Sequence, residues 1–323
     1  MGDILSLAGQ TLVSPIILSF ALGLFASISR SELSIPEAVA KAMSIYLLFA
    51  IGFKGGVSLN ESGMSTSLVL SLVAGLILSA ALPFIAFVLL QVMTNLDRTN
   101  AAAVAAHYGS ISIVTFVTAI SVLDQQSITS EGFMVAVAAV MEAPAILSAL
   151  YLVFKGSGET KMDATLWREI LLNGSIVLLV GAFFIGMITG TEGLTQIDSF
   201  IIAPFNGVLC LFLLDMGLVA GRGLRQARKI MGFSLVLFSF IMPLIGAALG
   251  CGVGLAIGLS SGGIALLMTL CASASYIAVP AAMRVALPEA NPSIYLTCSL
   301  GFTFPFNLTI GIPVYVAVAT ALA

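Results

Sequence analysis

Long apolar stretches separated by short polar loops run along the whole chain. Several of them reach the roughly 20 residues that a helix needs to cross a bilayer. Polar and apolar residues do not alternate with a period of two, which argues against an outer-membrane barrel. The pattern predicts ten transmembrane helices, at residues 12–28, 36–53, 66–90, 101–122, 132–154, 170–189, 199–219, 231–257, 262–286 and 293–320.

The two halves of the chain repeat one pattern at an offset of about 163 residues. The matched landmarks are Phe20–Gly23 with Phe183–Gly186, Ile51–Gly56 with Met216–Gly221, Gly109–Ser112 with Ala272–Ser275, and Pro144 with Pro305. Five helices per repeat is an odd number, so the second repeat enters the membrane upside down. Inverted repeats are typical of secondary transporters, whose substrate site lies where the halves meet.

The predicted fold class is therefore an all-α membrane protein with ten transmembrane helices in two inverted five-helix repeats and broken helices at the site. The first repeat covers residues 1–154 and the second covers 170–323. A linker at 155–169, which contains Gly-Ser-Gly and mixed charges, joins them.

The composition agrees with a chain that faces lipid. Hydrophobic residues make up 59% of the 323 residues and charged residues 8%, against about 25% charged residues in a soluble domain. One histidine is too few for a metal hydrolase. No phosphate loop indicates ATP-driven transport, and no aromatic and basic patch indicates nucleic acid. We expect no enzyme, no cofactor and no nucleic-acid partner. The cysteines suit neither a zinc site nor a disulfide framework; they are Cys210, Cys251, Cys271 and Cys298.

Basic residues gather on one side of the predicted membrane. With the N-terminus outside, eleven of the 12 lysines and arginines fall at cytoplasmic ends, and only Lys54 falls at an outer end. Positive residues remain on the cytoplasmic side during insertion. We therefore expect a multi-pass protein of the inner (plasma) membrane, with both termini outside and the 155–169 linker inside. The segment Met1–Gln10 lacks the basic residues that begin a cleavable signal peptide, so we expect none. The cluster Arg222, Arg225, Arg228 and Lys229 is either part of this topology signal or a docking surface for an anionic partner.

Two predicted helices carry small polar residues at mid-span, in equivalent positions of the two repeats. The fourth helix has Gly109, Ser110, Ser112 and Thr115, and the ninth has Ser273, Ser275 and Pro280. Because proline removes a backbone donor, we expect a helix break just before Pro280. Such breaks occur at membrane depth only where protein or a cavity covers them. Amides at the start of a half-helix attract an anion, and free carbonyls and hydroxyls suit sodium. The alternative is close helix packing by small residues alone.

Glu142 stands inside the fifth predicted helix, two residues before Pro144, and we expect a second helix break there. An ionised carboxylate at the bilayer centre costs roughly 2.5–3.5 kcal/mol. A coupling cation, a proton or several hydroxyl donors would offset that cost. The counterpart region in the tenth helix, Thr303–Asn307, holds neutral polar groups. Any ion site is therefore expected to differ between the repeats.

Three further polar residues each have two interpretations. Asp215 in the seventh helix is either a second cation ligand or the partner of an arginine such as Arg222. His107, the only histidine, is either a proton relay or a satisfied interior histidine. Lys54, flanked by glycines, either lines an outer vestibule that attracts anions or anchors the helix by snorkelling.

Several motifs together resemble a known family. They are Ile35-Pro36-Glu37, Ile51-Gly52 with Gly55-Gly56, the helix 4 motif ending in Ser112 and Thr115, Met141–Ala145, Ser273 and Ser275 with Pro280 and Arg284, and Ala290–Ser293 with Tyr295. Over nearly its whole length the chain resembles the sodium-dependent bicarbonate transporters first associated with cyanobacterial carbon concentration. The family pattern has aspartate where this chain has Glu142 and Tyr276, and it is richer in serine and glycine around both clusters.

The resemblance implies a core and a gate domain, each drawn from both repeats, and a homotrimer that moves by an elevator-type shift. It implies a bicarbonate and sodium site between the fourth and ninth helices. Together with the polar clusters, it indicates substrate binding by Gly109, Ser110, Ser112, Thr115, Ser273 and Ser275. The residues expected to bind sodium are Glu142, Ser112, Thr115, Ser275 and Tyr276. In the family, a trimeric PII-like signalling protein binds the cytoplasmic face.

Three functions are compatible with these residues. The first is sodium-coupled uptake of bicarbonate or a related small anion through the lipid bilayer, with sodium as the coupling ion. The second is a proton- or sodium-coupled symporter of another small carboxylate, because the site is larger and less polar than the family pattern. The third is a membrane receptor that binds an anion without sustained transport.

Overall fold

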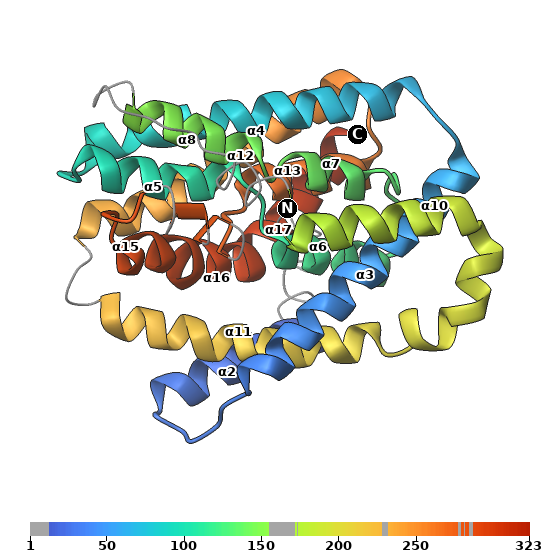
Figure 1. Ribbon diagram of the computed structural model, residues 1–323, viewed down its shortest axis with the longest axis horizontal. Helices are drawn as coiled ribbons and strands as arrows, with labels where there is room; N and C mark the ends of the chain where they lie inside the picture. Colours follow the sequence, from blue (N-terminus) through green and yellow to red (C-terminus); the bar gives the residue numbers. More distant parts are fainter. Residues whose placement is uncertain are drawn as a thin grey trace.

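The computed structural model describes residues 13–154, 172, 174–227, 232–276, 279–280, 282–283 and 287–323. The predicted linker at 155–169 lies outside these residues, as do Arg228, Lys229 and Arg284. Every regular element in the described part of the chain is helical, which confirms the predicted all-α class (Figure 1).

Within this part, eight helical stretches are long and apolar enough to cross a membrane. They are Glu37–Glu61, Thr66–Met93, Arg98–Gln125, Met134–Val153, Ile176–Ile201, Phe205–Arg225, Phe233–Ile257 and Pro292–Leu322. Two shorter apolar helices are Pro15–Ile28 and Ser261–Ala272. Large apolar side chains on their outer surfaces are exposed, among them Phe25, Ile77, Val88 and Phe184. Such a surface suits lipid rather than water.

Four helices form one group on the lower and right-hand side of Figure 1. They are α2 (Pro15–Ile28), α3 (Glu37–Ser62), α10 (Gly174–Ile201) and α11 (Phe205–Ala227). α2 lies along α11, and α3 lies along α10. Backbones meet at both crossings, because a Cβ on Gly23 would lie 2.0 Å from the Leu214 carbonyl oxygen and one on Gly186 would lie 2.0 Å from the Phe53 carbonyl oxygen.

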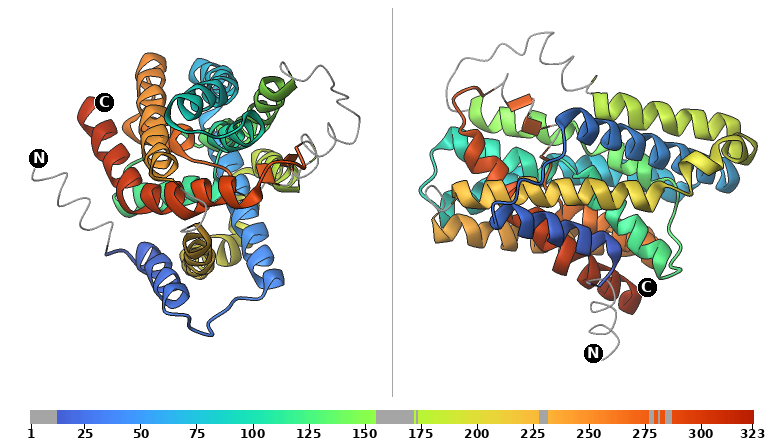
Figure 2. Two further views of the ribbon diagram at one scale, coloured as in Figure 1. Left: turned by 90° about the vertical axis from the view of Figure 1, so that its left-hand side faces the viewer. Right: turned by 90° about the horizontal axis from the view of Figure 1, so that it is seen from below.

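The remaining helices form a second group beside the first (Figure 2). They are α4 (Thr66–Met93), α5 (Arg98–Gly109), α6 (Ile113–Gln125), α7 (Met134–Val140), α8 (Pro144–Phe154), α12 (Phe233–Ile257), α13 (Ser261–Ala272) and a last helical run. That run comprises α15 (Pro292–Leu296), η1 (Thr297–Thr303), α16 (Phe304–Phe306), η2 (Asn307–Gly311) and α17 (Ile312–Leu322), where η1 and η2 are π-helical. α12 packs on α13 and α4, and α4 packs on α5 and α8.

The second predicted helix is longer than expected, because α3 continues to Ser62 rather than ending at residue 53. Polar side chains near its end find partners on α10: Asn60 donates to the Met187 carbonyl at 2.9 Å, and Glu61 accepts from the Thr191 hydroxyl at 2.8 Å. Lys54 therefore lies within α3 rather than at its end.

The connection between the sixth and seventh predicted helices also differs from the prediction. A loop was expected after residue 189. α10 continues to Ile201 through a kink at Gly190, whose φ of 58° and ψ of −155° are not helical. Only glycine adopts this combination readily. Asn60 satisfies the nearby Met187 carbonyl, so the kink leaves that acceptor partnered.

Candidate functional site

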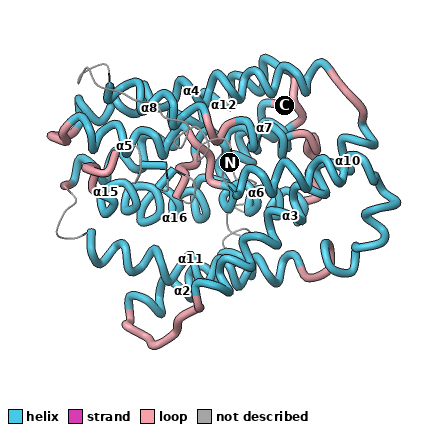
Figure 3. The backbone as a smooth tube through the Cα atoms, viewed as in Figure 1, coloured by secondary structure: helices cyan, strands magenta, loops and turns pink. Residues whose placement is uncertain are grey.

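The fourth predicted helix is broken in the interior of the protein. α5 ends at Gly109, Ser110–Ser112 are not helical, and α6 begins at Ile113 (Figure 3). Ser112 is the N-cap of α6, since its hydroxyl accepts hydrogen bonds from the Thr115 amide at 3.3 Å and the Thr115 hydroxyl at 2.9 Å. Ser112 and Thr115, which the sequence singled out together, therefore form one hydrogen-bonded pair at the start of a half-helix.

The ninth predicted helix is broken at the equivalent place. α13 ends at Ala272, and Ser273–Ser275 are not helical. The break begins at Ser273, and the chain is helical again at Val279–Pro280, so the non-helical stretch precedes Pro280 as expected. The chain stops being helical after Ala272 because an amide that follows bonds to the other repeat instead of to its own helix. The Ser275 amide donates to the His107 carbonyl at 2.7 Å and to the Ser110 carbonyl at 3.2 Å.

The two breaks are joined by serine hydroxyls as well as by backbone. The Ser112 amide donates to the Ser273 hydroxyl at 2.9 Å, and that hydroxyl donates to the Leu270 carbonyl at 2.9 Å. Amides at the start of the half-helices near Ser112 and Ser275 were expected to attract an anion. The amides of these two residues themselves bond to protein acceptors.

Several polar atoms around the breaks are buried without a hydrogen-bond partner. They are the Ser110 hydroxyl, the Tyr276 hydroxyl and one carboxylate oxygen of Glu142. Ser110 and Glu142 are 1% and 4% exposed, so water outside the protein does not compensate them. Buried polar groups without partners cost free energy, and each one at a native site calls for an explanation. A bound ligand or ion is the simplest one here.

Glu142 lies in a third break, between α7 and α8, as Pro144 indicated. The Ser79 hydroxyl of α4 donates to the Met141 carbonyl freed by this break, at 2.6 Å. The same residue adjoins the end of α5, because a Cβ on Gly109 would lie 2.7 Å from the Ser79 carbonyl oxygen. Gly109 thus permits the close approach of α4, and Ser79 links two of the breaks.

The sequence analysis missed the supporting role of Asn307. Its side-chain amide donates to the Ala272 carbonyl at the end of α13 at 2.9 Å, and its side-chain oxygen accepts from the Tyr315 hydroxyl at 2.9 Å. Asn307 therefore satisfies a carbonyl that the break in the ninth helix leaves without a helical partner. An asparagine in an otherwise apolar stretch was the available signal.

The chain is similar to one known protein family over nearly its whole length. The family model described as the Na+-dependent bicarbonate transporter superfamily matches residues 15–320. The chain belongs to this superfamily. No curated protein gives a significant match to the sequence.

Oxygen atoms are the groups in this chain that could bind the sodium ion of a Na+-dependent superfamily. Among the described residues, no group of three or more histidine, cysteine or acidic side chains could hold a metal ion. Sodium is a hard cation, which carbonyl and hydroxyl oxygens bind well. Glu142 and the hydroxyls of Ser112, Thr115 and Ser275 are all buried near the breaks and supply such oxygens.

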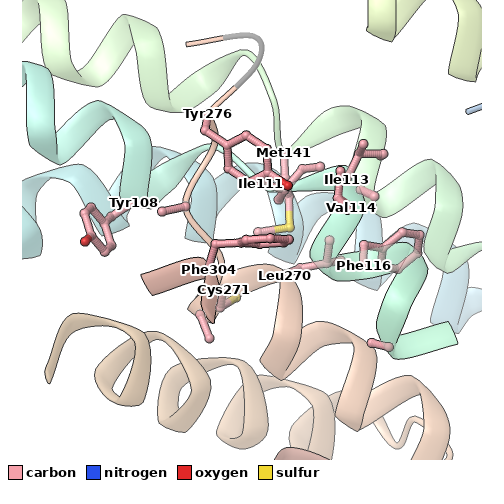
Figure 4. Close-up of a cluster of buried hydrophobic side chains, with 14 of the residues drawn as sticks. Tyr108, Ile111, Ile113, Val114, Phe116, Met141, Leu270, Cys271, Tyr276 and Phe304 are labelled. Atoms are coloured by element: carbon pink, nitrogen blue, oxygen red, sulfur yellow. The ribbon is translucent and has the colours of Figure 1, made fainter. Parts of the chain in front are cut away.

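The broken helices are also flanked by an apolar wall. Tyr276 packs edge-on against Phe304, with ring centroids 5.1 Å apart. Figure 4 shows the Tyr276 ring reaching toward Ile113 at the start of α6, with Met141 beside it. The polar groups of the breaks are therefore surrounded by side chains that exclude water, which strengthens any electrostatic contact made there.

Three further candidates were open to two interpretations. His107 adjoins the breaks, since its carbonyl accepts from the Ser275 amide. Its ring stacks on Tyr295 with centroids 4.6 Å apart, its Nδ1 contacts the Ala103 carbonyl at 2.6 Å, and its buried Nε2 has no hydrogen-bond partner among the described residues. Asp215 is buried on α11, within the electrostatic reach of Arg222 but without a salt bridge. Lys54 lies on α3. The four cysteines are free, as the sequence indicated.

Proposed function

We propose that the chain takes up bicarbonate or a related small anion together with sodium, by elevator-type alternating access. The observation that carries this proposal is the meeting of two broken helices, α5–α6 and α13, in a chain of this superfamily. Half-helix ends and freed carbonyls facing each other inside a membrane protein are the usual build of a site for an anion and its coupling cation.

The proposed ten-helix inverted repeat is supported by two equivalent crossings. The repeat offset pairs Gly23 with Gly186, and these two glycines carry the α2–α11 and α3–α10 contacts respectively. On the other side of each crossing stand Gly217 and Gly52, which the repeat also pairs. One helix contact thus occurs twice, as a two-fold relation between the halves requires. We assign these four helices to the gate domain and the second group to the core.

The proposed anion site lies at the start of α6. The first-turn amides of Ile113 and Val114 have no carbonyl four residues earlier within the helix, and they carry the positive end of its dipole. The unpartnered hydroxyls of Ser110 and Tyr276 are further donors beside them. No lysine or arginine occurs in α6 or α13, so amides and hydroxyls are the donors that these helices offer.

Sodium coupling follows from charge. A membrane potential of about −100 mV opposes an entering anion by about 2.3 kcal/mol per charge. One co-transported sodium ion cancels that electrical cost, and its own gradient then drives uptake. Glu142, whose carboxylate has an unpartnered oxygen, is the residue that we assign to this ion, together with the hydroxyls of Ser112, Thr115 and Ser275 and the Tyr276 side chain.

The deciding experiment is uptake of labelled bicarbonate by proteoliposomes, with and without an inward sodium gradient. We expect uptake only with sodium. Uptake of an organic anion that follows the pH gradient and ignores sodium would identify the proton-coupled symporter instead. Saturable binding without accumulation would identify a receptor. An excess of acetate serves as competitor in the same assay.

The apolar wall favours a second candidate substrate class. Ile111, Ile113 and Val114 are buried beside the polar groups of the first break, and Tyr276 covers them. A small monocarboxylate with a methyl or ethyl group would bury that group against these side chains, which bicarbonate cannot do. Inhibition of bicarbonate uptake by millimolar acetate or propionate supports this candidate, and the absence of inhibition excludes it.

The remaining parts of the proposal concern orientation and assembly. Both termini lie outside the cell membrane, and the basic residues Arg222 and Arg225 at the end of α11 lie inside. A homotrimer is the assembly that the resemblance implies, and cross-linking in membranes tests it. Binding of a PII-like protein to the cytoplasmic face is tested by co-purification with wild-type protein and with an Arg222→Glu, Arg225→Glu variant.

A further inference from the structure

A cavity of about 690 Å³ lies among three helices of the gate, α3, α10 and α11. α3 forms one wall from Glu37 to Leu48, and the other two helices contribute Leu178, Phe212 and Met216. None of the residues assigned above to the anion or to sodium lines this cavity. Any ligand that it holds is therefore separate from the broken helices.

The depth of the cavity matches one leaflet of a bilayer. Its lining residues on α3 run from Glu37, where the helix begins, to Leu48, which is a rise of about 16 Å along the helix axis. The hydrocarbon core of a bilayer is about 30 Å thick, so one leaflet contributes about 15 Å. The cavity thus extends from one membrane surface to about the bilayer centre, which is the depth that the acyl chain of a lipid occupies.

The lining changes from charged to apolar along this depth. Glu37 and Lys41, at the membrane surface, are exposed. At the deep end the floor is formed by Leu48, Phe212 and Met216, which are all buried. Ile45 lies between the two ends and is 48% exposed, so the cavity is reached from the outer surface of the gate. This order of charged, open and apolar parts matches a molecule with a polar headgroup and a hydrocarbon chain.

The two charges at the surface end are of opposite sign. Glu37 and Lys41 are four residues apart on α3, a spacing that places their Cβ atoms about 5–6 Å from each other. In the part of the chain that the structure describes, neither side chain has a salt bridge. The pair carries no net charge, so it favours neither a simple anion nor a simple cation. A ligand with both charges matches it, with a phosphate against Lys41 and an ammonium group against Glu37.

We propose that this cavity, called the gate groove below, binds a phospholipid with a primary-amine headgroup of the phosphatidylethanolamine type. One acyl chain fills the space above Leu48, Phe212 and Met216. An empty space would cost these side chains their dispersion contacts on one side, and the chain restores them. The Glu37 carboxylate accepts hydrogen bonds from the primary ammonium group, which a quaternary ammonium cannot donate. The same carboxylate repels a headgroup with net negative charge.

The gate groove is independent of the proposed transport. Its assignment to the cytoplasmic leaflet follows from the proposed orientation, but the match between groove and lipid does not depend on which side is inside. The lipid would fill the contact between α3 and the start of α10, two helices that pack along each other in the gate. It is therefore a structural ligand of the gate rather than a substrate.

The first test measures which lipid the protein retains. Protein reconstituted with equal amounts of phosphatidylethanolamine and phosphatidylglycerol is extracted, stripped of lipid stepwise and weighed by native mass spectrometry. Wild type should retain phosphatidylethanolamine over phosphatidylglycerol by about two- to fivefold, the range expected from an exposed charge pair. Lys41→Gln should lower retention of both lipids, because both carry the phosphate. Glu37→Gln should abolish the preference, because it removes the partner of the ammonium group.

Matched controls come from the loop before α3. Arg30→Gln and Glu32→Gln remove the same two charges from exposed positions that do not line the groove, and both variants should retain lipid as wild type does. Equal retention of the two lipids by wild type would overturn the proposal. Wild-type retention and preference in both Lys41→Gln and Glu37→Gln would overturn it as well.

A second experiment locates the lipid and tests a second copy of the chain as the occupant. A phosphatidylethanolamine with a photoreactive acyl chain should label α3 between Lys41 and Leu48, and Ala40→Phe, which fills the groove, should reduce that labelling. Ile45→Cys, in a variant without the four native cysteines, should form no disulfide between copies in membranes. Absence of labelling, equal labelling in Ala40→Phe, or a disulfide-linked dimer would each overturn the proposal. Vesicles that accumulate no anion would contradict the proposed function and leave these readouts unaffected.

Discussion

The backbone amide of Ser112 donates a hydrogen bond to the hydroxyl of Ser273 across 2.9 Å, although 161 residues separate them. The bond joins the first break to the second, and the Ser275 amide returns the connection through the His107 and Ser110 carbonyls. The two breaks are therefore packed against each other in the interior, where electrostatic contacts are stronger than in water.

Replacing Ser112 with alanine should weaken uptake by about ten- to hundredfold, because it removes a hydroxyl that caps the first turn of the proposed anion site and that we assign to sodium; a contact with a charged group is worth roughly 1.5–3 kcal/mol. The variant also loses an N-cap, at a cost of about 1 kcal/mol of stability. Ser65→Ala removes the equivalent cap from α4 away from the site, so it controls for that loss. Cys251→Ala on α12 is a second control. KM for uptake is the measurement, and wild-type KM in Ser112→Ala and Ser275→Ala would contradict the proposed location.

Glu142→Gln should raise the sodium concentration required for half-maximal uptake by about tenfold or more, because a neutral amide replaces a carboxylate that we assign to sodium; this corresponds to about 1.4 kcal/mol. Anion KM at saturating sodium should change much less. Sodium titrations of the initial uptake rate provide the measurement. An unchanged sodium dependence would show that Glu142 is not a sodium ligand, even if transport survives.

Gly190→Ala should destabilise the protein by about 1–3 kcal/mol, since its φ of 58° and ψ of −155° suit only glycine. The new Cβ would also lie 2.9 Å from the Asn60 side-chain oxygen. Gly181→Ala is the matched control on the same helix, because a Cβ there meets nothing within 4 Å. That variant should be neutral or stabilising by up to about 1 kcal/mol. Thermal unfolding in detergent compares the two, and equal midpoints would refute the strain.

Asn307→Leu should cost about 1–3 kcal/mol of stability, because it leaves the buried Ala272 carbonyl and Tyr315 hydroxyl without their partner. Since that carbonyl ends α13, we also expect weaker anion uptake. Thr309→Val, on the same helical run, removes only a hydroxyl that bonds to its own helix and serves as the control. Wild-type stability and uptake in Asn307→Leu would exclude the supporting role.

The proposed topology predicts opposite labelling of two exposed positions. Ser31→Cys, between α2 and α3, should react with a membrane-impermeant maleimide only after the membrane is opened. Gln125→Cys, at the end of α6, should react in intact cells. The reason is the concentration of basic residues on one side of the chain. The reverse pattern would invert the proposed orientation.

The serine and threonine positions at the breaks were singled out from the sequence, but their hydrogen bonds were not predicted. Ser112 and Thr115 are three residues apart at the start of one helix, so their hydrogen bond follows from local geometry alone. The Ser112 and Ser275 amides bond to residues of the opposite repeat, which no local pattern specifies. Ser79 and Asn307, which satisfy carbonyls at the breaks, carry no local sign of their partners.

Hydrophobic stretches of bilayer length, repeated glycine and serine motifs and one-sided basic residues determined the helical class, the paired breaks and the superfamily, because each depends on composition or on spacing within one helix. Tertiary structure alone decided that α3 continues past Lys54, that α10 kinks at Gly190, and that Tyr276 packs against Phe304 beside the breaks. These features depend on partners from distant segments: Asn60 meets Met187 across 127 residues, and Lys54 meets a ring on α11. Such contacts form only when the two halves are packed together, so neither half of the sequence predicts them by itself.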